Sequence, residues 1–231
     1  MKKRMATDWV FLLGLAAMVL RRQLYITGVD EKGLLLRNHP LSLVLLAMTA
    51  MVGLMILRTV RKAEQVEENG FVSALGHAVM ALGILATVLP GVPVAGYLGI
   101  VWRWLGLISP LCLLAAGAAA ALRKQPFFLL HVIPCLFFVV HIVSHYQLWS
   151  GDPQMQNYLF ALLGSMALTL FAFYTAAAEA GCGNHRMRMA VGMAAVYLCL
   201  AELANSADPL LYFAGFIWVR ADQYRFRAGK E

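Results

Sequence analysis

Three of the six histidines in this 231-residue chain, His131, His141 and His145, lie within one apolar segment. At about 100° per residue, all three fall on one face of a helix. Imidazole titrates near neutral pH and ligates metals, so histidines inside an apolar segment are candidates for proton or metal chemistry. Along the axis, His131 and His145 would stand about 21 Å apart. One small site therefore cannot use both.

The outer level of the predicted bundle gathers most of the remaining polar side chains. The candidate ligand-binding residues are His39, His141, His145, Glu202, Asn205 and Asp208, with Asp152 in a neighbouring loop. Ionisable residues in membrane spans are costly and tend to face cavities or one another. The first hypothesis is an outward-facing pocket that binds a small solute or ion for transport or sensing, with Glu202 and His141 as its deepest pair. Alternatively, Glu202 reaches the interface and His141 bonds to a neighbouring helix.

A metal- or haem-binding protein is the second hypothesis. His141 and His145, four residues apart, form a two-ligand comb that zinc or copper accepts when a carboxylate joins. His77 with His131 would suit an inner haem, and His39 with His141 or His145 an outer one, for electron transfer across the membrane. The first hypothesis needs no cofactor. A third hypothesis is a structural or assembly subunit, bound to a partner subunit or to a second copy.

Catalytic motifs are missing from the sequence: it has no HExxH, GxSxG, P-loop or GxGxxG pattern. We therefore predict no catalytic residue and expect no enzyme. Glu179 is placed at the inner end of a span, where a charge costs little. The net charge of +7 suits cytoplasmic loops beside anionic lipid and, without basic–aromatic runs, does not indicate nucleic-acid binding.

Composition determines which elements must position these residues. Hydrophobic residues make up 61% of the chain and charged residues 13%, against about 45–50% and 25% in soluble domains. These proportions exclude a soluble domain and predict an all-α, polytopic helix bundle in lipid, formed by one domain over 1–231. The expected spans are 5–22, 40–57, 71–89, 104–122, 127–148, 157–179, 187–205 and 209–222.

Basic residues orient the predicted bundle. With eight spans, most Lys and Arg fall at the two termini and in the loops on the same side, which predicts a bacterial cell membrane protein with both termini cytoplasmic. Arg103, between Trp102 and Trp104, is expected to reach the headgroup belt. The first outer loop is predicted to form a short β-hairpin over 24–36, with its turn at Asp30–Gly33.

Two stretches carry a resemblance: one comprises His145–Pro153, Asn157–Phe160 and Ala172–Tyr174, and the other runs from Tyr25 to Pro40 in the first loop. They resemble a group of small multi-pass membrane proteins from Gram-positive anaerobic bacteria. That group has no established activity. The resemblance therefore implies a membrane location and contributes no site residue.

Overall fold

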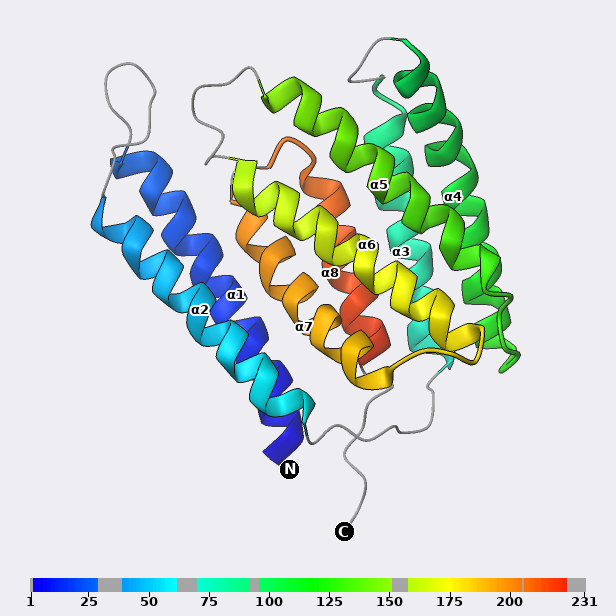
Figure 1. The fold of residues 1–231 in the computed structure, drawn as a ribbon, viewed down its shortest axis with the longest axis horizontal. Coiled ribbons are helices and arrows are strands. Elements are labelled where there is room, and N and C mark those ends of the chain that lie inside the picture. The colour runs from blue at the N-terminus through cyan, green and yellow to red at the C-terminus, as the bar shows by residue number, and fades with distance from the viewer. Residues whose placement is uncertain are drawn as a thin grey trace.

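The computed structural model describes residues 2–28, 39–61, 70–91, 96–150, 158–204 and 206–223, and these form eight α-helices and no strand (Figure 1). The helices are α1 (Lys2–Thr27), α2 (Pro40–Val60), α3 (Gly70–Val88), α4 (Tyr97–Ala121), α5 (Leu129–Trp149), α6 (Leu159–Glu179), α7 (His185–Glu202) and α8 (Pro209–Gln223). The all-helical prediction is confirmed for this part of the chain.

Six of the helices form a closed ring of neighbours. Each of α3 to α7 packs on the next helix in the sequence, and α8 closes the ring by packing on α3. The α1–α2 pair stands outside the ring and packs on α7, as Figure 1 shows. Successive helices alternate in direction. We call the end where α1 begins the N-terminal end, and the end where α1 finishes the opposite end.

Small residues allow the ring to close between α3 and α8. A Cβ atom on Gly83 would lie 2.3 Å from that of Ala214, and one on Gly76 would lie 2.6 Å from that of Ala221. Both pairs are spaced by seven residues, two helical turns, so they lie along one seam. In lipid, such close backbone approach is a main source of helix–helix attraction.

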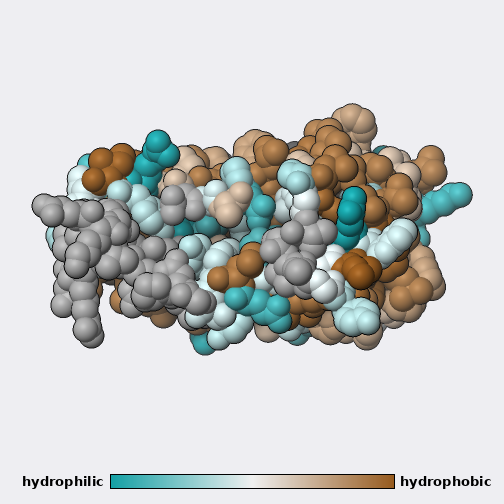
Figure 2. Space-filling view, turned by 90° about the horizontal axis from the view of Figure 1, so that it is seen from above, coloured by the Kyte–Doolittle hydropathy of each residue, from teal (hydrophilic) through white to brown (hydrophobic). Residues whose placement is uncertain are grey.

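Large hydrophobic side chains cover much of the outside of the bundle. Leu46 on α2, Phe71 and Leu82 on α3 and Leu111 on α4 are all more than 60% exposed. The end-on view of Figure 2 shows hydrophobic side chains along the upper and right-hand edges and hydrophilic ones scattered across the middle. Helices α1 to α6 are long and apolar enough to cross a membrane. This is the construction of a multi-pass membrane protein.

Two helices do not meet the length and composition of a membrane span, although spans were expected at 187–205 and 209–222. Helix α8 has 15 residues, and α7 has 18 residues that include two arginines and a glutamate. Helix α7 packs against α1, α2, α6 and α8, so little of it faces outward. A helix enclosed by protein can carry paired charges, which explains why its composition is less apolar than that of a lipid-facing span.

The expected β-hairpin over 24–36 is wrong in its first strand. Residues Leu24–Thr27 continue α1 as helix, and Gly28 follows it with its N–H donating to the carbonyl of Leu24 at 2.8 Å. The Tyr25 ring contacts the guanidinium of Arg21 one turn earlier on the same helix, and Arg21 is itself paired with Glu202 on α7, so these contacts stabilise the last turn of α1. The remainder of the expected hairpin, residues 29–36, lies outside the described residues.

Candidate functional site

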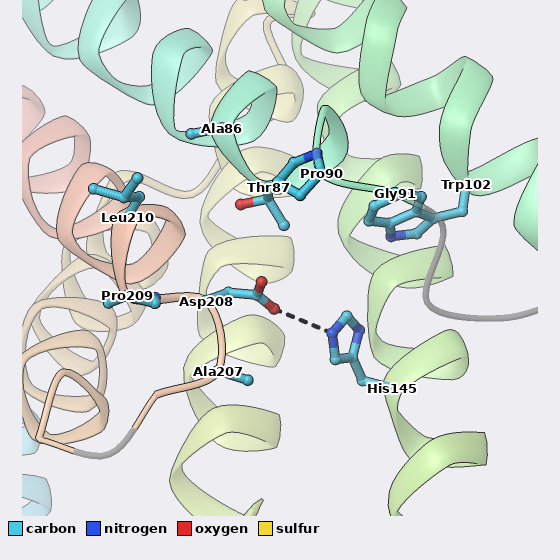
Figure 3. A pocket seen from close by; sticks show the side chains of 10 residues that line it. All are labelled: Ala86, Thr87, Pro90, Gly91, Trp102, His145, Ala207, Asp208, Pro209 and Leu210. Carbon is cyan, nitrogen blue, oxygen red and sulfur yellow. Dashed lines mark ion pairs between the residues drawn. The ribbon is translucent and has the colours of Figure 1, made fainter.

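A pocket of about 480 Å³ opens at the opposite end of the ring. Figure 3 shows its walls: the end of α3 and the following turn, Trp102 from α4, His145 from α5, and the segment that starts α8. The lining residues are Ala86, Thr87, Pro90, Gly91, Trp102, His145, Ala207, Asp208, Pro209 and Leu210. Four of the six ring helices therefore contribute to it.

Asp208 enters the pocket because of how α8 begins. Pro209 occupies the first helical position, which its fixed φ suits, and the carbonyl of Asp208 accepts from the N–H of Leu211 at 3.1 Å. The backbone N–H of Asp208 donates to Ser206 Oγ at 3.0 Å. A carboxylate at a helix N-terminus is also favoured by the helix dipole.

His145 and Asp208 form the polar contact drawn in Figure 3. His145 Nδ1 lies 3.0 Å from the carbonyl of His141, which can only accept, so Nδ1 carries a proton. His145 Nε2 lies 3.1 Å from Asp208 Oδ2. Burial by itself would raise the pKa of Asp208, but the hydrogen bond from His145 and the nearby imidazoles hold that pKa below its usual value. The contact with His145 therefore favours the ionised form of the Asp208 carboxyl group.

His141 lies beneath this pair and is almost fully buried. Its Nδ1 accepts a hydrogen bond from Trp102 Nε1 at 3.4 Å, which leaves the proton of the neutral ring on Nε2. That Nε2 has no hydrogen-bond partner among the described residues, and Asp208 Oδ2 stands 3.9 Å away. A buried polar atom without a partner is costly, which marks this position as one that a bound ligand would satisfy.

The three side chains also have the composition of a metal site. One ligand atom each from His141, His145 and Asp208 lies within 4.8 Å of the other two. Two imidazoles and a carboxylate match catalytic zinc and non-haem iron sites, which leave positions open to small molecules. Because His145 Nδ1 donates to a carbonyl, its Nε2 is the nitrogen available to a metal. His141 would first have to move its proton from Nε2 to Nδ1.

Glu202 is buried as expected, but its partner is Arg21 rather than His141. Arg21 Nη1 donates to Glu202 Oε2 and to the carbonyl of Ala201, and both side chains are 3% exposed. The guanidinium also lies 4.9 Å from the centre of the Phe160 ring. This ion pair joins α1 to α7. The hypothesis that Glu202 and His141 form the deepest pair of the pocket is therefore wrong.

The other two candidate residues are not part of the described pocket. His39 caps α2, with Nδ1 accepting from the N–H of Leu41 at 3.3 Å, and α2 packs against α1 and α7. It is therefore not paired with His141 or His145 as an outer haem would require. Asn205 lies outside the described residues, as does Asp152.

A second histidine cluster lies at the N-terminal end of the ring. His77 Nε2 and His131 Nε2 are 2.9 Å apart, and His131 Nδ1 is 2.8 Å from Glu179 Oε2. His77 Nδ1 lies 2.7 Å from the carbonyl of Ser73. The two Nε2 atoms bond to each other and leave no axial position between them. This arrangement is not the haem ligand pair considered from the sequence.

Three functional side chains were not predicted from the sequence. Trp102 was expected in the headgroup belt, yet it is buried and bonds to His141, whereas Arg103 and Trp104 are exposed. Glu179 was expected at the inner end of a span, where a charge costs little, and was given no partner, yet it contacts His131. Arg21, near the end of the expected span 5–22, was not among the candidate site residues. Successive residues point about 100° apart on a helix, a signal that could have separated Trp102 from its neighbours.

No family model, curated protein or solved structure matches this chain.

Proposed function

We propose that this protein binds a small solute or ion in the pocket at the opposite end of the ring, for transport or sensing. The observation that carries the proposal is the His145–Asp208 pair inside a cavity of about 480 Å³. Small-molecule sites usually measure about 300–1,000 Å³ and combine apolar walls with a few polar groups. Asp208 is 22% exposed, so the pair can be reached from the aqueous phase.

The proposal includes the membrane topology. All eight helices cross a bacterial cell membrane, both termini are cytoplasmic, and the pocket faces outward. The support is the alternating direction of the helices and the gathering of basic residues at the N-terminal end. The enclosed position of α7 and α8 in the ring removes their need for an apolar surface.

Thermal unfolding of the detergent-purified protein tests the binding proposal. A panel of sodium, potassium, magnesium and calcium salts, amino acids and simple sugars is added to the wild type. At least one member should raise the melting temperature with saturating concentration dependence. That shift should vanish in Asp208→Asn and His145→Gln and persist in the control Tyr146→Phe, whose exposed side chain is next to His145. A shift that survives in Asp208→Asn would place binding elsewhere.

A transition-metal ion is the second candidate ligand, favoured by the clustering of His141, His145 and Asp208. Cobalt(II) is a suitable probe because its visible absorption reports the ligand geometry. We expect one cobalt ion per chain, displaced by zinc, and loss of the absorption in His141→Gln as well as in Asp208→Asn. Calcium or a sugar that stabilises the protein while cobalt and zinc do not bind would exclude this candidate.

A further inference from the structure

The cluster of His77, His131 and Glu179 contains three short polar contacts in a row. They run from the carbonyl of Ser73 to His77 Nδ1, from His77 Nε2 to His131 Nε2, and from His131 Nδ1 to Glu179 Oε2. Their lengths are 2.7, 2.9 and 2.8 Å. Distances in this range require a proton between the two heavy atoms, because two facing lone pairs would repel each other.

These three contacts contain one more proton than two neutral imidazoles and an ionised carboxylate can supply. Three hydrogen bonds need three protons. Two neutral imidazoles carry one proton each, and an ionised carboxylate carries none. The Ser73 carbonyl cannot donate, so it supplies none either. The third proton must be bound in addition, and because imidazole is a stronger base than a carboxylate, it makes one of the two rings an imidazolium beside the Glu179 carboxylate.

We infer that His77, His131 and Glu179 form a proton-binding site at the N-terminal end of the ring, distinct from the pocket at the opposite end. Glu179 is the entrance, because its side chain is 10% exposed while that of His131 is 1% exposed. A proton from bulk water reaches Glu179 first and is then shared with the imidazoles. The Ser73 carbonyl can only accept a hydrogen bond and cannot pass a proton on, so the site stores a proton.

Releasing the proton alters a contact between helices. Without it, the Nε2 atoms of His77 on α3 and His131 on α5 both present lone pairs, and their 2.9 Å contact is lost. These rings lie inside the helix ring, since Trp218 from α8 contacts both of them and Phe171 from α6 as well. The site thus couples one proton to the packing between α3 and α5.

Among the described side chains around the two histidines, Glu179 on α6 is the carboxylate that contacts them, through His131. Helix α4 presents Gly117, where a Cβ atom would lie 3.0 Å from that of His77, and α8 presents Trp218. The nearby buried ion pair, Arg188 with Asp222, joins α7 to α8. Further described ionisable groups at this end are Arg220 with Asp8, the half-buried His185, and the exposed Arg58, Arg61, Arg123, Lys124 and Arg186.

Trp218 provides an optical test. Its ring is nearly parallel to that of His131, at 5° and 6.2 Å between centroids. A protonated imidazole quenches indole fluorescence, and a neutral one does so much less. The emission of the detergent-purified wild type minus that of Trp218→Phe is followed from about pH 5 to 10. We expect this difference to increase through a single one-proton transition as the pH rises.

Two variants and one control assign the transition. His131→Gln should abolish it. Glu179→Gln should move its midpoint down by about one pH unit or more, because the carboxylate that favours the imidazolium is removed. His145→Gln, at the opposite end of the same helix, should leave it unchanged. Emission that does not vary with pH in a folded wild type, or a transition that persists in His131→Gln, would overturn the inference.

A measurement on the wild type covers the case in which His131→Gln does not fold. In protein labelled with ¹⁵N-histidine, a scalar coupling across the N–H···N bond should connect one imidazole pair at low pH and disappear at high pH. Absence of this coupling throughout the pH range would also refute the proton site.

Discussion

Pairs of ionisable side chains connect different elements of the fold in this protein. Arg21 on α1 pairs with Glu202 on α7, Arg188 on α7 with Asp222 on α8, and His131 on α5 with Glu179 on α6. His145 on α5 pairs with Asp208 before α8. An unpaired charge inside a bundle is far more costly than a paired one, so each pair fixes how its two elements sit together.

The Arg21–Glu202 pair gives a prediction about stability. Glu202→Gln leaves the guanidinium of Arg21 buried without its counter-charge, and the expected loss is about 3–5 kcal/mol of unfolding free energy. In the double variant Arg21→Met with Glu202→Gln no charge remains, so most of this loss should be regained. Thermal and denaturant unfolding in detergent measure both. A double variant no more stable than Glu202→Gln alone would contradict the role assigned to the pair.

Trp102 gives a prediction about proton placement at the pocket. Its indole N–H bonds to His141 Nδ1 and so keeps the proton on Nε2, the nitrogen that a metal would need. Removal of this one hydrogen bond in Trp102→Phe should tighten zinc binding by roughly three- to tenfold, corresponding to about 1 kcal/mol. Isothermal titration calorimetry with zinc measures the change.

Trp149→Phe is the matched control, because Trp149 contacts His145 through ring packing, with 5.1 Å between the two centroids. It should leave zinc affinity near that of the wild type. If Trp102→Phe instead weakens zinc binding as strongly as Asp208→Asn does, then Trp102 supports the metal geometry and the tautomer argument is wrong.

Among the helices, α5 and α7 organise the molecule. Helix α5 carries His131 near one end of the ring and His141 and His145 near the other, so one helix contacts both polar clusters. Helix α7 packs on four helices and carries a buried charge near each end. The outward faces of the lipid-facing helices need no such charges and carry large hydrophobic side chains instead.

The seam between α3 and α8 can be tested by exchanging a methyl group. Gly83→Ala would set a Cβ atom 2.3 Å from that of Ala214, so we expect a loss of about 1–3 kcal/mol from overpacking. Adding Ala214→Gly removes the clashing atom and should restore part of that loss, although the carbonyl of Leu210 remains 3.0 Å away. A double-mutant cycle of melting temperatures measures the coupling, and additive effects would argue against direct contact.

In the molecule as a whole, the two polar clusters lie at opposite ends of a closed helix ring, and hydrophobic side chains fill the space between them. Phe137, Leu168 and Phe171 belong to this central core and are almost fully buried. Such close packing separates the pocket from the proton site in this conformation. Transport would therefore require the helices of the ring to rearrange.

Cys182 reports on which side of the membrane the N-terminal end lies. It is the exposed one among the four cysteines and stands between α6 and α7. If that end is cytoplasmic, a membrane-impermeant maleimide should label Cys182 in inverted vesicles and not in intact cells. Ser150→Cys in a Cys182→Ser background, at the opposite end, should show the reverse pattern. Labelling of both positions from one side would refute the eight-crossing topology.

The helices and the medium around them follow from local sequence. Apolar segments of about 20 residues, separated by prolines, glycines and charges, predicted the helices. The predicted start lies within three residues of the observed start for seven of the eight helices and is seven residues too late for α4. Helical periodicity also placed His141 with His145. Both conclusions rest on local regularity, which a sequence displays directly.

Which polar groups meet depends instead on how the helices pack. Counting residues along the predicted helices put Glu202, His141 and Asp208 at the same depth. In the structure, the direction in which each helix face points pairs Glu202 with Arg21 and brings His141 and Asp208 to the pocket. Packing also brought Glu179 to His131 and turned Trp102 inward. Which side chains become partners depends on how closely the helix backbones approach each other. Small residues such as those of the α3–α8 seam set that distance, but only between helices that have already come together, which the sequence alone does not show.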